Sequence, residues 1–352
     1  MFFANFNKTI NDQQRYSSVD LFRAAAVISV LLTHFGKFVP YFYKYGGLGV
    51  DLFFVISGFL ITNSLTGDLS NQKPVSYKKF LLKRAFKILP SYYFFLLFGY
   101  IFSILFIKPI APEQVPLLKE LPQYIFFYRN YGGPPERLAF DHIWSLCVEE
   151  HFYLSLPLLF IVVPRLFKKD IYLLYFIAAF IALIWLLKII EYNTMVAEYP
   201  SYSHNRFDAL GLGVLLSLFI HFYKDKIYFL TRNIYLFTIA SALLISAMAL
   251  TSNLSDFSQF FFLNTFAPLC FAIMMLSLLN YRFTGLKPIK FIAYCSYNLY
   301  LWHFIFIIPV IYYFGDSWKG FLIYAAISFL MAILTTKYIE EKALSLRAKI
   351  LH

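Results

Sequence analysis

An arginine and a histidine eleven positions apart mark the first apolar stretch of this chain, LFRAAAVISVLLTHF. On an α-helix, eleven steps of about 100° return the second side chain to within about 20° of the first. Arg23 and His34 would therefore share one helix face, about 16 Å apart along the axis, which is about half the hydrocarbon thickness of a bilayer. Because ionisable groups inside a membrane are costly unless they line a cavity, the spacing predicts a functional site.

Other ionisable residues fall at two depths once the apolar stretches are placed in a membrane. With the N-terminus in the cytoplasm, the outer half collects imidazoles and carboxylates: His34, Asp51, Glu149, Glu150, Asp208 and His303. The cytoplasmic side collects Arg23, Lys83, Arg84 and Lys87. Cationic side chains suit phosphate groups, whereas a neutral imidazole backed by a carboxylate can take a proton from a hydroxyl. This polarity favours a donor that carries phosphates at one end and a thioester at the other.

Several of these residues also have a purely structural interpretation. Arg23 can reach the cytoplasmic headgroups beside Asp20, and the basic run before the third span can reflect topology alone. Asp51 can cap the second span. His303 beside Trp302 can be an interfacial amphipathic pair.

The remaining histidines and the cysteines give no sign of a metal site. The histidines at 142, 151 and 204 are expected in loops or at the surface. No HExxH or equivalent spacing occurs, so no metal is expected. The three cysteines, at 147, 270 and 295, lie in apolar surroundings without paired spacing, which indicates neither a disulfide framework nor a zinc motif.

The composition requires a membrane-embedded scaffold for these side chains. Of 352 residues, 60% are hydrophobic and 14% are charged, and the mean hydropathy is +0.64. Long apolar stretches recur along the whole chain, which predicts an all-α, polytopic membrane protein. The net charge of +12 is explained by basic cytoplasmic loops, so we expect no nucleic-acid partner.

The apolar stretches predict about ten transmembrane helices with both termini in the cytoplasm. The spans are expected at 19–38, 47–66, 88–107, 143–163, 171–188, 207–222, 227–250, 257–280, 290–312 and 319–339. With this topology, the inside segments hold 21 Lys and Arg residues and the outside segments hold 9. The excess alternates from loop to loop, as cytoplasmic loops require.

We expect residues 1–352 to form a single integral-membrane domain with a helical core at about 15–342 and no appended soluble domain. The first apolar stretch begins with Asp20 and Arg23 and lacks a small-residue cleavage site, so it is predicted to be a retained span. The longest outside connection, 108–142, is rich in proline. Its piece LPQYIFFYRN is a candidate interfacial or re-entrant element.

At these residues the chain resembles the bacterial integral-membrane acyltransferases of acyltransferase family 3, over about 15–342. The motifs that carry the resemblance are YSSVDLFRAAAV with Arg23-x10-His34, GVDLFFVISGFLI with Asp51, WSLCVEEHFYL with Glu149, HNRFDALGLGVLLS with Arg206 and Asp208, and SYNLYLWHF with Tyr300 and His303. One motif departs from the family. The cytoplasmic Arg-x-x-Arg pattern reads Arg84-Ala85-Phe86-Lys87 here, and lysine lacks the bidentate fork of arginine.

The resemblance implies an enzyme of the bacterial cytoplasmic (inner) membrane that transfers an acyl group, in this family acetyl, from acetyl-CoA. The acceptor would be a hydroxyl of a cell-surface polysaccharide or its lipid-linked precursor, of O-antigen, exopolysaccharide or peptidoglycan type. Some members carry an extracytoplasmic esterase-like domain, so this chain would either act alone or use a separate periplasmic or extracellular partner.

The resemblance also assigns roles to the site residues. Those expected to hold the phosphates of the donor are Arg23, Arg84 and Lys87. His34 would be the general base or a transient acyl carrier, and Glu149 would orient it. His303 and Tyr300 would position the thioester or the acceptor hydroxyl. The residues expected to shape the outer acceptor site are Asp51, Arg206 and Asp208.

Two other functions remain compatible with the residues. A transporter of a lipid-linked or anionic substrate could use the same buried charges, although no two-fold internal repeat is found. An acyltransferase acting on a small cytoplasmic molecule would instead need an acceptor site that faces inward.

Overall fold

The computed structural model describes residues 17–35, 40–70, 74–132, 138–194, 201–283 and 285–351, and these ranges contain helices and no strand. The α-helices are α2 (Ser17–Leu32), α3 (Pro40–Tyr45), α4 (Leu48–Ser70), α5 (Tyr77–Phe102), α6 (Leu121–Ile125), α7 (Ile143–Phe167), α8 (Tyr172–Thr194), α9 (Ser203–Ile227), α10 (Ile234–Thr251), α11 (Asp256–Leu278), α12 (Lys287–Trp302), α13 (Ile307–Phe314), α14 (Trp318–Thr335) and α15 (Glu341–Leu351). The predicted all-α fold is confirmed.

Eight helical stretches of the described chain are long and apolar enough to cross a membrane. They are Leu48–Gly67, Tyr77–Ile107, Ile143–Phe167, Tyr172–Tyr192, Ser203–Arg232, Ile234–Thr251, Phe261–Leu278 and Trp318–Leu351. A ninth combines α12 with Phe304–Phe314 across a bend of 53°. Helix α2 has only 16 residues, and a span needs about 20. Length and composition therefore support eight or nine spans where about ten were expected.

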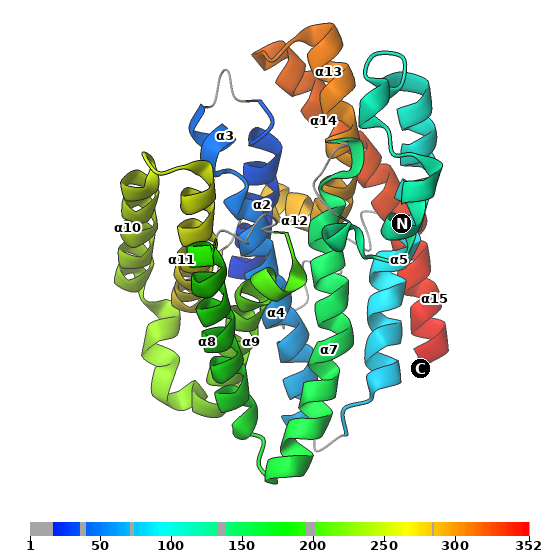
Figure 1. The fold of residues 1–352 in the computed structure, drawn as a ribbon. Helices are drawn as coiled ribbons and strands as arrows, with labels where there is room; N and C mark the ends of the chain where they lie inside the picture. Colours follow the sequence, from blue (N-terminus) through cyan, green and yellow to red (C-terminus); the bar gives the residue numbers. More distant parts are fainter. Residues whose placement is uncertain are drawn as a thin grey trace.

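Helix α4 lies inside the bundle, in contact with α2, α7, α9 and α11 (Figure 1). Its tightest contact is with α9, where two glycines face the backbone of the other helix. A Cβ atom on Gly58 would collide with the carbonyl oxygen of Leu210, and one on Gly213 would collide with that of Val55. Small residues let membrane helices approach this closely, so the SG and GLG segments of the two motifs fix the α4–α9 interface.

Two interruptions of regular helix bring polar side chains into the bundle. Helix α12 ends at Trp302, His303 occupies the break, and the chain resumes in a 3₁₀ turn, Phe304–Phe306, and then α13. Between α14 and α15 lies a π-helical turn, Thr336–Glu340. Such turns inside helices often occur at functional sites, and this one directs the buried Glu340 inward.

The connection before α7 folds back over the outer end of α5 (Figure 1). Its LPQYI segment forms the short helix α6, where an interfacial element was expected. The Tyr92 hydroxyl donates a hydrogen bond to the Tyr124 carbonyl at 2.6 Å and so attaches α6 to α5.

Candidate active site

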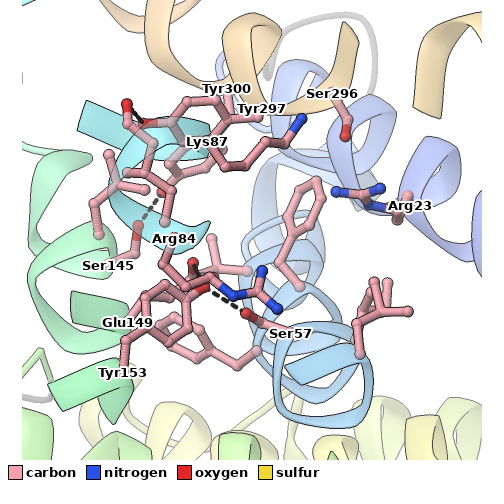
Figure 2. Close-up of a pocket in the computed structure, with 17 residues that line it drawn as sticks. Arg23, Ser57, Arg84, Lys87, Ser145, Glu149, Tyr153, Ser296, Tyr297 and Tyr300 are labelled. Atoms are coloured by element: carbon pink, nitrogen blue, oxygen red, sulfur yellow. Dashed lines mark hydrogen bonds between the residues drawn. The ribbon is translucent and has the colours of Figure 1, made fainter. Parts of the chain in front are cut away.

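The inner cavity, with a volume of about 110 Å³, is enclosed by α2, α4, α5, α7 and α12. It is lined by three cations predicted to act together, and these come from two helices (Figure 2). Arg23 comes from α2, whereas Arg84 and Lys87 come from α5. The other polar side chains of the lining are Ser57, Ser145, Glu149, Tyr153, Ser296, Tyr297 and Tyr300.

A hydrogen-bonded chain joins α4 to α7 across the inner cavity (Figure 2). The Tyr153 hydroxyl donates to the Glu149 carboxylate and lies 2.6 Å from Ser57 Oγ. The Arg84 guanidinium lies 5.7 Å from the centre of the Tyr153 ring, within the range of a cation–π interaction. Glu149 therefore lies among the inner cations, although depth along the sequence grouped it with the outer histidines.

Lys87 is fixed by a buried partner at the inner cavity. Its ammonium forms a salt bridge with Glu340 of the π-helical turn. The other carboxylate oxygen of Glu340 accepts a hydrogen bond from Asn298 Nδ2 at 2.7 Å. The carboxylate thus offsets part of the Lys87 charge, and Arg23 and Arg84 contribute more to any affinity for anions.

The outer cavity is larger, with a volume of about 870 Å³. The residues that line it are Val30, Thr33, His34, Tyr43, Lys44, Tyr45, Gly47, Leu48, Val50, Asp51, Asp141, His142, Trp144, Arg206, Gln259, Leu263, Asn264, Tyr300, His303 and Phe304. Aromatic rings, amides and carboxylates on one concave surface are typical of a site for a polar organic ligand.

Three imidazoles from separate segments meet in the outer cavity. The ring of His303 lies 5.4 Å from that of His34 and 5.3 Å from that of His142, measured between centroids. Phe304 packs on two of them, at 5.0 Å from His34 and 4.9 Å from His142. His34 and His303 were expected together. His142 was expected in a loop or at the surface, but only 4% of it is exposed.

Val50 and Tyr300 line both cavities and so form a shared wall between them. The Tyr300 hydroxyl donates to the His142 carbonyl at 3.1 Å and lies 2.6 Å from Ser145 Oγ. The Tyr300 side chain, which these two contacts hold in place, therefore separates the cationic inner cavity from the imidazole-lined outer cavity.

Of two buried ion pairs near the outer cavity, one lines it and the other does not. Arg206 Nη2 donates to Asp51 Oδ1 at 2.6 Å, and both residues line the cavity. Lys188 Nζ donates to Asp208 Oδ2 at 2.6 Å. Buried charges in proteins are paired in this way because unpaired ones are costly. Asp208 does not line the cavity, so the structure gives it a supporting position rather than the expected place in the acceptor site.

The expected contact between Glu149 and His34 is the main arrangement that the structure does not contain. The two residues line different cavities, and Glu149 takes its hydrogen bond from Tyr153. Helix α7 begins at Ile143, so Glu149 lies about 9 Å along its axis from that end. Residues that sequence reasoning did not select are His142, Tyr153 and Lys188. Only the position of His142, two residues before Trp144 of the WSL motif, signalled its role. Within the described ranges, no group of three or more His, Cys, Asp or Glu residues is arranged to hold a metal ion.

The helices and the two adjacent cavities define a multi-pass membrane protein with a polar site inside its bundle. Residues 16–337 match the acyltransferase domain, and the chain belongs to acyltransferase family 3. This membership favours the enzyme over the transporter. No solved structure matches the chain.

The curated relatives are bacterial O-acetyltransferases. The chain is 26% identical over 348 residues to the peptidoglycan O-acetyltransferase OatA of Listeria monocytogenes, covering 92% of this chain and 55% of the relative. It is 26% identical over 347 residues to the O-acetyltransferase OatA of Staphylococcus aureus, covering 92% and 56%. A putative peptidoglycan O-acetyltransferase of Bacillus subtilis, YrhL, is 27% identical over 162 residues, covering 43% and 24%. The chain thus spans about half the length of the two OatA proteins.

Proposed function

We propose that this acyltransferase moves an acetyl group from cytoplasmic acetyl-CoA to a hydroxyl of a cell-surface glycan or its lipid-linked precursor at the bacterial inner membrane. The single observation that carries the proposal is the pair of cavities, cationic inside and imidazole-lined outside, that share Val50 and Tyr300. Among surface glycans, peptidoglycan is favoured by the names of the Listeria monocytogenes and Bacillus subtilis relatives.

The inner cavity binds the donor. Arg23 and Arg84, with Lys87 beside them, hold phosphate oxygens of acetyl-CoA through charge-assisted hydrogen bonds. The thioester arm enters the cavity beside these cations, and the adenine end stays at the cytoplasmic mouth.

The acceptor binds in the outer cavity, where the acetyl group is transferred to it. The acceptor oxygen attacks the thioester carbonyl carbon, and an imidazole, which we assign to His34, takes the hydroxyl proton. The carbon–sulfur bond then breaks, and the imidazolium returns its proton to the leaving thiolate. His303 and Tyr300 lie next to this position and orient the reacting groups, while the Asp51–Arg206 pair stabilises the wall behind them.

The test uses the purified protein in liposomes with acetyl-CoA supplied from one side. We expect release of the CoA thiol together with base-labile acetate esters on glycan fragments, detected by mass spectrometry. Thiol release without any ester on cell-wall digests or chitopentaose would contradict the glycan acceptor, and no thiol release at all would contradict acetyl-CoA as the donor.

A further inference from the structure

His142 has one ring nitrogen whose role is fixed by the backbone. Its Nε2 lies 3.0 Å from the carbonyl oxygen of Leu301, at the end of α12. A carbonyl oxygen only accepts hydrogen bonds, so Nε2 carries the proton and donates it. Burial lowers the pKa of His142 to about 3, so the ring is neutral at physiological pH. Its other nitrogen, Nδ1, therefore holds a lone pair.

That lone pair has no partner in the described part of the chain. Nδ1 of His142 is buried and accepts no hydrogen bond from any described residue, while the residue lines the outer cavity. Buried polar atoms without partners are rare in native proteins because each one is costly. An acceptor without a partner, on a residue that lines the cavity, is therefore suited to a donor that arrives with a ligand.

His303 shows the same arrangement with the nitrogens exchanged. Its Nδ1 lies 2.6 Å from the Tyr300 carbonyl oxygen and so carries the proton, and its buried Nε2 has no partner among the described residues. The two rings are 5.3 Å apart between centroids. Two hydrogen-bond acceptors side by side favour a ligand that brings hydroxyl donors, as a sugar does.

We propose that His142 contacts the acceptor directly, with its Nδ1 accepting a hydrogen bond from a hydroxyl of the glycan in the outer cavity. The Leu301 carbonyl fixes the tautomer that leaves Nδ1 available. This assignment rests on the proposed function. It adds to that reaction a residue at the N-terminal end of α7 that binds the acceptor.

Two substitutions separate this role from a structural one. In His142→Gln, the side-chain amide keeps a donor for the Leu301 carbonyl and loses the acceptor at the Nδ1 position. In His142→Asn, an oxygen can replace Nδ1 as an acceptor and the bond to Leu301 is lost. His204→Gln is the matched control, since that side chain is 45% exposed.

Each protein is reconstituted in liposomes with acetyl-CoA, and the acceptors are chitopentaose and digested cell wall. We expect the acceptor KM of His142→Gln to rise about tenfold or more. His142→Asn should melt at a lower temperature yet keep an acceptor KM within about threefold of wild type. His204→Gln should match wild type in both assays.

The opposite pattern, a normal acceptor KM in His142→Gln and a raised one in His142→Asn, would show that only the Leu301 bond matters and would overturn the assignment. An equal rise in both variants would also overturn it, because the amide oxygen of asparagine should serve as an acceptor. A failure of the proposed function would differ from a failure of the His142 assignment, because the wild-type protein itself would then form no ester.

Discussion

The inner and outer cavities lie on two sides of one tyrosine and differ in volume and in charge. The inner cavity has a volume of about 110 Å³ and is lined by two arginines and a lysine, whereas the outer one has about 870 Å³ and three imidazoles. Fixed cations suit a ligand that always carries negative charge. Imidazoles whose protons are directed at backbone carbonyls suit a neutral ligand with hydroxyl groups.

The two cavities also differ in whether their polar side chains have hydrogen-bond partners within the protein. In the inner cavity, Glu149 and Lys87 have partners within the protein. In the outer cavity, His142 and His303 each leave one buried nitrogen without a partner in the described ranges. The inner side is thus organised before substrate arrives, and the outer side keeps hydrogen-bonding capacity for its ligand.

The largest effect is expected at His34, which we assign as the general base in the outer cavity. His34→Ala should lower acetyl transfer by about 10²–10⁴-fold, because a positioned general base contributes about that much. The measurement is ester formation per unit of protein in liposomes, with His204→Ala as the exposed control. Wild-type transfer by a correctly folded His34→Ala protein would refute the assignment.

The next largest effect is expected on stability, when the Asp51–Arg206 ion pair of the outer cavity is broken. Asp51→Asn removes the carboxylate that accepts from Arg206, and breaking a buried pair costs about 3–5 kcal/mol. Thermal unfolding in detergent checks this, and adding Arg206→Gln to the variant should recover part of the loss. A melting temperature equal to wild type would mean that the pair contributes little.

Asp141, which also lines the outer cavity, should make the stability of the fold depend on pH. Burial raises the pKa of this carboxyl to about 6, and Arg129 opposes the shift. Because this folded-state pKa exceeds the unfolded value, the protonated form favours folding, and stability falls as pH rises through about 6. Asp141→Asn removes that step, so its advantage over wild type should grow by about 2 kcal/mol between pH 4 and 7.5.

Melting curves of wild type and Asp141→Asn at a series of pH values measure this difference directly. Titration of the other carboxyl groups cancels in the comparison. A difference that stays constant across the series would contradict the raised pKa of Asp141.

The smallest effect is expected at the inner cavity. Arg84→Gln should raise the KM for acetyl-CoA about tenfold to a hundredfold while kcat changes little, because a hydrogen bond to a charged group contributes about 1.5–3 kcal/mol. Steady-state kinetics at varied acetyl-CoA measures it. Lys83→Gln, on the same helix but outside the cavity lining, is the control. Equal effects of the two substitutions would point to general surface charge instead.

Sequence reasoning recovered most of the fold because membrane helices are determined locally. Nine of the ten predicted spans each overlap one long α-helix of the described chain, since backbone groups in hydrocarbon must bond within their own segment. The span predicted at 290–312 is instead divided between α12 and α13 by the break at His303. The span predicted at 19–38 also differs in length, because α2 ends at Leu32, and residues 36–38 of that span lie outside the described ranges. Hydropathy detects apolar stretches, but it does not detect where a helix ends.

The sequence by itself determined the all-α membrane fold and the family, because these follow from composition and from motifs along the chain. The shared helix face expected for Arg23 and His34 is not found, because α2 ends at Leu32 and His34 lies in the turn that follows it. Only the tertiary structure decided that Glu149 joins the arginines rather than His34, and that His142 turns into the outer cavity. Those contacts join segments distant in the chain, and their formation depends on how deeply each helix begins and which face it presents. Neither property is encoded in the local pattern of residues.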